Sequence, residues 1–189
     1  SELQVDTITA TAFLNTDVAA SFAAITWLFL AWSLEKKPKF LGLLTGSVAG
    51  LATITPAAGF VTVQQAAIIG IVSGIVCYFA VSLKNKLQWD DALDVWGVHG
   101  VGGSIGIIML GLFASSSVNP MVTTNGLLVG GGFNFFWIQL ISVIGVCAYA
   151  FIFSYVMLWL INFVTSVKVT KEEEEAGLDS SLHGEVAYE

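Results

Sequence analysis

The chain has 189 residues, of which 56% are hydrophobic and 11% are charged, and its mean hydropathy is +0.81. An ordinary soluble domain is about half apolar and about a quarter charged, so this composition excludes a soluble enzyme domain, a nucleic-acid-binding protein and a disordered regulator. Seven lysines, no arginine and a net charge of −7 also argue against a polyanionic partner. A membrane protein is the class that remains.

The apolar runs predict five membrane spans, each of which ordinarily needs about 20 residues. They are expected at residues 9–34, 40–55, 63–83, 91–114 and 127–167. The second is short and therefore has to lie inside a bundle. The fifth is too long for one straight crossing, so it is tilted, kinked near Gly130–Gly132, or continued beyond the membrane. The expected fold is an all-α, polytopic bundle over residues 1–167, followed by a cytoplasmic tail at 168–189.

Small residues recur along the predicted spans at helical spacing. Gly42, Gly46 and Gly50 form a GxxxGxxxG pattern, and Gly70 and Gly74 form GxxxG. Small residues let membrane helices approach closely, because lipid provides no hydrophobic drive for their association. The pattern indicates a compact bundle and excludes a loose single-helix anchor.

The lysines give the orientation of the predicted spans. They lie at residues 36–39, 84–86 and 168–171, in three segments that five spans place on one side. The loops on the other side carry no charge. The positive-inside bias makes the lysine side cytoplasmic, so we expect an outside N-terminus and a cytoplasmic tail.

His99 is the main ionisable residue within the spans, in the run DDALDVWGVHGVGGSIG. It lies roughly 12 Å along a helix from Asp91, near the middle of an apolar layer about 30 Å thick. A lone histidine in a soluble core is usually only structural. An imidazole within a membrane instead needs a polar partner or a cavity, which favours a functional residue.

Three carboxylates accompany the predicted spans. Asp91 and Asp94 open the fourth span, where a carboxylate can cap free N–H groups; for Asp94 a structural or capping role is expected. Asp17 lies eight residues into the first span. It could face the bundle interior, a water-filled vestibule or the interface, and these alternatives stay open.

No metal or cofactor is expected. Cys77 and Cys147 lie in apolar runs, and the sequence has neither a CxxC spacing nor a Cys/His cluster. A haem-holding redox subunit would need a second histidine within the membrane, but His183 lies in the tail. The tail also holds seven of the fourteen acidic residues, and its mixed composition suits docking onto a surface.

Several segments resemble one family. The run DDALDVWGVHGVGG, the segments AFLNT and TPAAGFV, and the tail GLDSSLHGEVAYE are similar to the ammonium transporter (Amt/Mep/Rh) superfamily, and the tail to its Amt branch. The resemblance covers essentially the whole chain. It implies an eleven-helix fold of two inverted five-helix repeats plus one helix, assembled as a homotrimer with a pore in each subunit. This chain matches the second half, the seventh to eleventh spans.

The resemblance also implies roles for single residues. His99 matches the second of two paired pore histidines, Val95 an aliphatic residue of the pore wall, and Asp91 the acidic residue eight positions earlier. The residues that match the regulatory tail motif are Gly177, Leu178, Asp179, His183, Gly184, Glu185, Ala187 and Tyr188. The missing N-terminal half would supply the partner histidine, the outer recruitment site and a phenylalanine gate.

The function implied by the resemblance is transport of ammonium or ammonia across the plasma membrane, and not an enzymatic activity. Moving the bare cation into an apolar pore is costly, whereas neutral ammonia costs far less. A histidine proton relay along an apolar pore would therefore suit the task. The resemblance also implies a P-II-type nitrogen regulatory protein at the cytoplasmic face. The alternatives are an ammonium sensor of the same fold and an incomplete transporter fragment.

Overall fold

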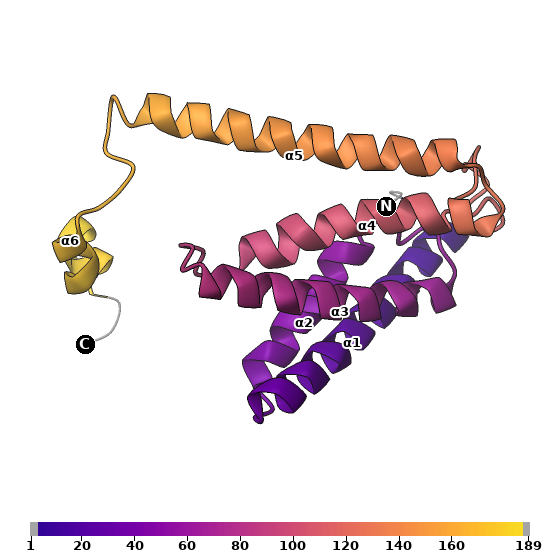
Figure 1. The fold of residues 1–189 in the computed structure, drawn as a ribbon, viewed down its shortest axis with the longest axis horizontal. Helices are drawn as coiled ribbons and strands as arrows, with labels where there is room; N and C mark the ends of the chain where they lie inside the picture. Colours follow the sequence, from indigo (N-terminus) through magenta and orange to yellow (C-terminus); the bar gives the residue numbers. More distant parts are fainter. Residues whose placement is uncertain (1–3, 187–189) are drawn as a thin grey trace. The chain divides into compact units, whose positions relative to one another are not determined.

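The computed structural model describes residues 4–186, which form helices and connecting loops without a strand. Two compact units divide the chain at the middle of its longest apolar run: Ser1–Ile144 and Gly145–Glu189. The first four α-helices belong to the first unit (Figure 1). The elements in order are α1 (Thr7–Glu35), α2 (Phe40–Ile54), α3 (Val63–Lys86), π-helix η1 (Trp96–Val101), α4 (Gly102–Phe113), 3₁₀-helix η2 (Leu127–Val129), α5 (Phe133–Ile161), α6 (Lys171–Ala176) and π-helix η3 (Asp179–His183).

The helix ends carry recognisable local signals. The Asp6 side chain accepts a hydrogen bond from the Thr9 N–H at 2.8 Å and so caps α1. Thr62 and Gln65 form a reciprocal capping box at the start of α3. Lys36 has φ +62°, a left-handed conformation that ends α1.

The helix bounds differ from the expected spans mainly in the second half of the chain. The helical part of the fourth segment begins at Trp96, five residues after the expected start, because residues 91–94 form a turn. The fifth segment is interrupted at Gly130, whose φ is +83°, and its helix covers Phe133–Ile161. The long run therefore contains a short 3₁₀ turn followed by one 29-residue helix.

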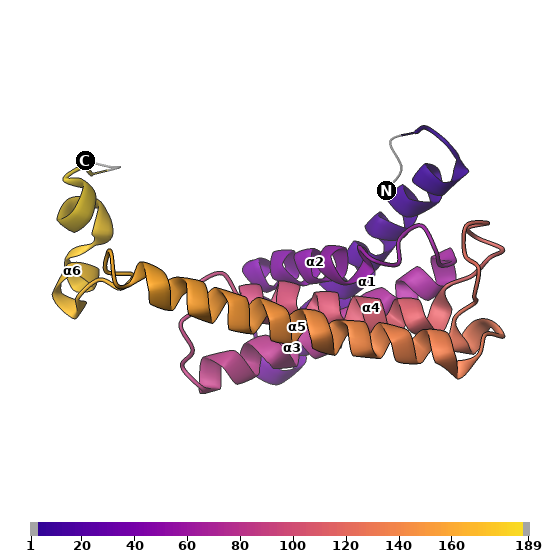
Figure 2. The same cartoon turned by 90° about the horizontal axis from the view of Figure 1, so that it is seen from above.

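Within residues 4–186, four helical segments are long and apolar enough to cross a membrane. They are Thr7–Glu35, Val63–Lys86, Trp96–Phe113 and Phe133–Ile161. Helix α2 is shorter, with 15 residues, and packs against both α1 and α3. Figure 2 shows α2 running beside α1 in a second view. A short apolar helix is thereby held inside a bundle.

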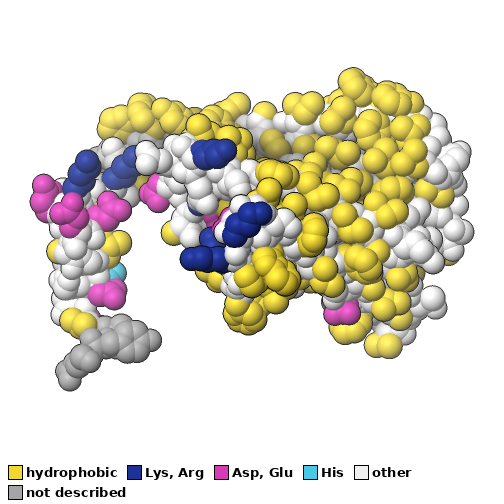
Figure 3. Space-filling model, turned by 60° about the horizontal axis from the view of Figure 1, so that its bottom comes forward, with side chains coloured by type: hydrophobic (Ala, Val, Ile, Leu, Met, Phe, Trp, Pro, Cys, Tyr) yellow, Lys and Arg dark blue, Asp and Glu magenta, His cyan; other side chains and the backbone are white. Residues whose placement is uncertain are grey.

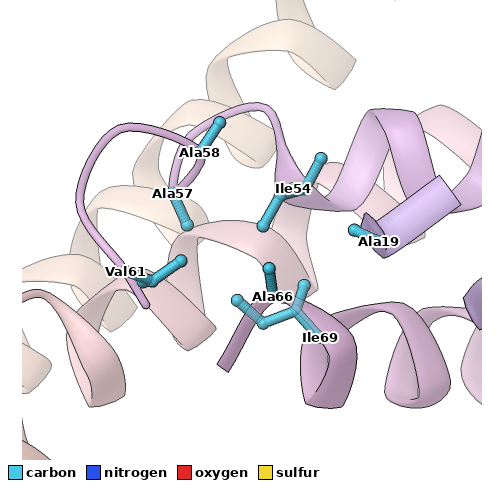
Figure 4. Packing of buried hydrophobic residues seen from close by; sticks show 7 residues of the cluster. All are labelled: Ala19, Ile54, Ala57, Ala58, Val61, Ala66 and Ile69. Carbon is cyan, nitrogen blue, oxygen red and sulfur yellow. The ribbon is translucent and has the colours of Figure 1, made fainter. Parts of the chain in front are cut away.

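Small residues bring α1, α2 and α3 together. A Cβ atom at Gly50 or at Gly70 would lie 2.5 Å from the carbonyl oxygen of Ala19, so neither position has room for a side chain. Figure 4 shows the buried cluster beside this contact, which is formed by Ala19, Ile54, Ala57, Ala58, Val61, Ala66 and Ile69. Close backbone approach is the expected way for membrane helices to gain van der Waals contact.

Apolar side chains also cover much of the surface of the first unit. Large hydrophobic residues such as Phe13, Ile25, Phe29 and Phe40 are more than 60% exposed. In Figure 3 yellow apolar side chains dominate the face of the helical bundle, while dark-blue lysines gather towards one end of it. A surface of this kind suits contact with lipid or with further helices.

Candidate functional site

The helix that carries His99 begins with a charged cap. Oδ1 of Asp91 accepts the Val95 N–H and Oδ2 accepts the Trp96 N–H, both at 2.9 Å. Two backbone donors that a helix start leaves unpaired thus have a carboxylate partner. Asp91 therefore makes the cap at this helix start.

The Asp94 side chain contacts the neighbouring helix α3. Its Oδ1 lies 2.7 Å from Nζ of Lys84, which is 6% exposed, and its backbone φ is +56°. Asp94, for which a structural or capping role was expected, thus forms an ion pair with Lys84 of α3. Nothing in the sequence marks Lys84 as special, because Lys84 and Lys86 look alike in the run LKNK.

His99 lies within the π-helical turn Trp96–Val101, which continues directly into α4. A π-helical turn is rare, and where it interrupts an α-helix it often occurs at a functional site. The turn alters the angular spacing of the side chains on either side of it. It therefore decides which side chains of this segment face the bundle.

One face of the segment is buried against α2 and α3. Val98 is 2% exposed, and a Cβ atom at Gly97 would lie 2.7 Å from Cγ2 of Val81. A Cβ atom at Gly102 would lie 2.9 Å from Oγ1 of Thr53. The glycines of this face thus let the His99 segment approach its two neighbours closely.

The opposite face is open in this chain. Val95 is 49% exposed and His99 is also exposed; their spacing of four residues places them on one side of a helix. A Cβ atom at Gly103, a further four residues on, would meet no atom within 4 Å. The sequence-predicted residues Val95 and His99 therefore share an exposed, mostly apolar face.

The chemistry available on this face is that of one imidazole. Within residues 4–186, no hydrogen bond or ion pair engages the His99 side chain, and no group of three or more His, Cys, Asp or Glu side chains could hold a metal ion. An imidazole can donate and accept hydrogen bonds and can pass a proton between its two nitrogens. A polar molecule moving along this face could use it in either way.

The remaining predicted residues lie elsewhere. Asp17 is exposed on α1. In the tail, residues 179–183 form the π-helix η3, and Gly177 and Gly184 adopt positive φ angles around it. The tail-motif residues Leu178, Asp179, His183 and Glu185 are exposed, whereas Ala187 and Tyr188 lie outside the described residues.

A cavity of about 610 Å³ lies at the opposite end of the bundle from the loop of Lys36–Lys39. The start of α1, the loop after α2, and residues 119–121 form its walls. Its lining is mostly apolar, with threonines and Asn119 among the lining residues. Val95, His99 and Asp91 do not line it.

Comparison with known families and curated proteins gives a consistent result. A model described as the Ammonium Transporter Family matches residues 1–188. A Bacillus subtilis protein named ammonium transporter is 42% identical over 190 residues, which are 100% of this chain and 46% of that protein. Ammonium transporter Amt1 of Archaeoglobus fulgidus is 39% identical over 188 residues, which are 100% of this chain and 47% of that protein. The chain spans about half the length of these curated relatives.

Solved structures are similar as well. Candida albicans Mep2 matches with a TM-score of 0.80 and 35% sequence identity, covering 90% of this chain and 38% of that one. A structure titled Sensor Amt Protein matches with a TM-score of 0.83 and 29% identity, covering 95% of this chain and 43% of that one. The helical arrangement is thus shared with known structures over nearly the whole chain.

Proposed function

The chain belongs to the ammonium transporter family, and we propose that it forms the second half of a subunit that moves ammonium across a membrane as ammonia. The observation that carries this proposal is the exposed face of Val95 and His99, at the start of the segment Trp96–Phe113, which is long and apolar enough to span a membrane. The curated relatives are named transporters and not enzymes.

The physical task explains why an imidazole would be used. An ammonium ion is strongly hydrated, and an apolar pore offers it no equivalent solvation. Ammonia without the extra proton is neutral and crosses such a region at far lower cost. A pathway that removes the proton on one side, passes ammonia along an apolar wall and returns the proton on the other side avoids burying a charge.

We assign the residues of the pathway as follows. His99 hydrogen-bonds the passing ammonia and relays a proton, because a neutral imidazole both donates and accepts. Val95 belongs to the apolar wall that excludes the hydrated cation. Asp91 belongs to the same pathway; its hydrogen bonds to the N–H groups of Val95 and Trp96 support the view that it holds the His99 helix in place.

The open face of Val95 and His99 needs a complementary surface. We propose that the N-terminal half of the fold supplies it, together with a second histidine within hydrogen-bonding distance of His99. Two imidazolium ions so close would repel strongly, so the pair would be neutral or share one proton. The length of the curated relatives, about twice that of this chain, supports a missing half.

The assembly and its surroundings are part of the same proposal. The complete subunits form a homotrimer in the plasma membrane, with an outside N-terminus and a cytoplasmic tail. The orientation rests on the lysines at 36–39 and 84–86, which lie at helix ends on the same side of the bundle. A P-II-type regulatory protein would bind at this cytoplasmic face.

A sensor is the second candidate, because the chain is 29% identical to a structure titled Sensor Amt Protein. In a sensor the same face would bind ammonium without passing it on. The two candidates differ in a flux measurement: purified protein in liposomes moves ammonium if it is a transporter. A sensor would instead show ammonium-dependent protection of residues 168–186 from hydrogen exchange without flux.

The decisive experiment on the site is His99→Ala in the full-length protein. We expect a folded protein with lost ammonium uptake, or with uptake that also admits other cations once the proton-transfer step is gone. Charge movement and uptake in liposomes measure both outcomes. Ile141→Ala, at an exposed aliphatic position of α5, is the control and should transport normally. Unchanged rate and selectivity in folded His99→Ala would show that His99 is only a packing residue.

A further inference from the structure

Lys84 differs from every other lysine of the chain. It is 6% exposed, whereas the other six lysines are exposed. Lysine is almost never buried without a partner, because its ammonium group loses its hydration. The contacts of the ammonium group therefore have to explain why the Lys84 side chain is buried.

The Lys84 ammonium holds the turn from which the His99 helix starts. Nζ of Lys84 donates a hydrogen bond to the backbone oxygen of Asp91 at 2.7 Å and forms an ion pair with Oδ1 of Asp94, also at 2.7 Å. The Asp94 N–H reaches the same Asp91 oxygen at 3.3 Å. One side chain at the end of α3 thus joins both ends of the turn 91–94.

This turn has a backbone that needs support. Asp94 has φ +56°, in the left-handed region that L-residues other than glycine seldom adopt. The carboxylate of Asp91, three residues before Asp94, accepts hydrogen bonds from the N–H groups of Val95 and Trp96. Without the ammonium group, the Asp94 carboxylate would lose its partner and the turn would lose the contact that joins it to α3.

The geometry of the turn is transmitted directly to His99. His99 follows Asp94 by five residues, somewhat more than one helical turn of 3.6 residues. Between them, the π-helical turn begins at Trp96, and Gly97 lies against Val81, three residues before Lys84 on α3. A shift at the start of the helix would therefore rotate or displace the His99 side chain within its face.

We propose that Lys84 is a positioning residue for His99, which it fixes in place by binding the backbone of Asp91 and the carboxylate of Asp94. The inference rests on the proposed function in so far as it concerns transport. The ammonium group of Lys84 contacts the backbone of Asp91 and the carboxylate of Asp94, and not His99. Its effect on transport is exerted through the 91–94 turn.

The test uses Lys84→Met in the full-length protein, with Lys86→Met as the matched control. Methionine keeps an unbranched apolar stem and removes the charge, and Lys86 is an exposed lysine two residues further on. Amide hydrogen exchange of residues 95–101 is the first measurement. We expect Lys84→Met to raise it by about tenfold or more, since it removes the buried partner of the ion pair and frees the 91–94 turn from α3, and Lys86→Met to leave it within about twofold.

The second measurement is selectivity in liposomes. If Lys84 positions His99, Lys84→Met lowers ammonium uptake per folded protein and changes the ratio of ammonium to potassium uptake. A purely structural lysine would lower the yield of folded protein and leave that ratio unchanged. An unchanged ratio, or unchanged exchange at residues 95–101, overturns the proposal.

Two further variants keep the test decisive if Lys84→Met does not fold. Asp94→Asn removes the other half of the ion pair, and Lys84→Met/Asp94→Asn removes both charges at once. Each should produce the same rise in exchange at residues 95–101, and the effects of the two single changes should not add. Additive or absent effects overturn the proposal. If the unchanged protein moves no ammonium, the proposed function fails, while the exchange measurements still decide the role of Lys84.

Discussion

Gly106 of α4 lies directly against the backbone of Thr53 in α2: a Cβ atom at Gly106 would overlap the carbonyl oxygen of Thr53. The same residue of α2 contributes its hydroxyl to a buried hydrogen bond with the Ser73 hydroxyl of α3, at 2.8 Å. Three helices thus meet around Thr53. These contacts around Thr53 hold one face of the His99 segment, the face that lies opposite Val95 and His99.

The first prediction concerns Gly103 and Gly106, two glycines of α4. Gly106→Ala should destabilise the protein by about 1–3 kcal/mol, because an added methyl group would force α4 away from Thr53. Gly103→Ala is the matched control, since a Cβ atom there would meet nothing within 4 Å. Thermal denaturation in detergent checks both. Equal stability of the two variants would contradict the close contact at Thr53.

The second prediction concerns Asn15, which is completely buried in α1. Its Nδ2 donates hydrogen bonds to the carbonyl oxygens of Ala58 and Val61, at 2.8 and 2.7 Å. Asn15→Ala leaves both carbonyls unpaired and should cost about 2 kcal/mol or more.

Thr16→Ala is the matched control for Asn15, because the Thr16 hydroxyl bonds only the carbonyl of Ala12 in its own helix. It should change the free energy of unfolding by less than about 0.5 kcal/mol. Denaturation midpoints in detergent distinguish the two variants. A wild-type midpoint for Asn15→Ala would show that the loop after α2 is held by other contacts.

The third prediction concerns pH and the start of α6. The pKa of Glu173 lies below its ordinary value, because the backbone N–H and the hydroxyl of Thr170 donate to its carboxylate. A lowered pKa in the folded state means that the stabilisation is complete above the pKa of an unfolded glutamate, about 4.3. It is lost as the pH falls through the lower pKa of the folded carboxylate.

Amide exchange of Glu173 and Glu174 as a function of pH, corrected for intrinsic exchange, measures this loss. Glu173→Gln can still form the capping box but does not titrate. It should keep the helix start and remove its pH dependence in this range. A pH dependence that persists in Glu173→Gln would assign the effect to another group.

The fourth prediction concerns the acidic tail. The tail carries seven carboxylates, and we expect it to dock onto a basic surface, either the lysine-bearing segments at 36–39 and 84–86 or a neighbouring subunit. Deleting residues 177–189 should lower or deregulate transport and leave the oligomer intact. Uptake in nitrogen-rich and nitrogen-poor cells, together with size-exclusion chromatography, checks both parts. Normal uptake by the truncated protein in every nitrogen condition would refute a regulatory tail.

The sequence by itself determined the class of the protein, the order of its helices and its family. These properties follow from composition, from apolar runs and from the motif around His99, all of which are local in the chain. The family and the all-helical fold are confirmed by the family match and the similar solved structures. The spacing of Val95 and His99 also predicts that they share a helix face.

Only the tertiary structure decided how the start of the His99 helix is held. Asp91 and Asp94 are similar carboxylates three residues apart, yet Asp91 caps the helix and Asp94 forms an ion pair with α3. Lys84 and Lys86 are equally plain in the sequence, but only Lys84 is buried. The difference depends on the backbone conformation of a single turn and on the approach of α3 to it. Neither is encoded in the local pattern of residue types, because both arise from the way in which the end of α3 packs against the turn 91–94.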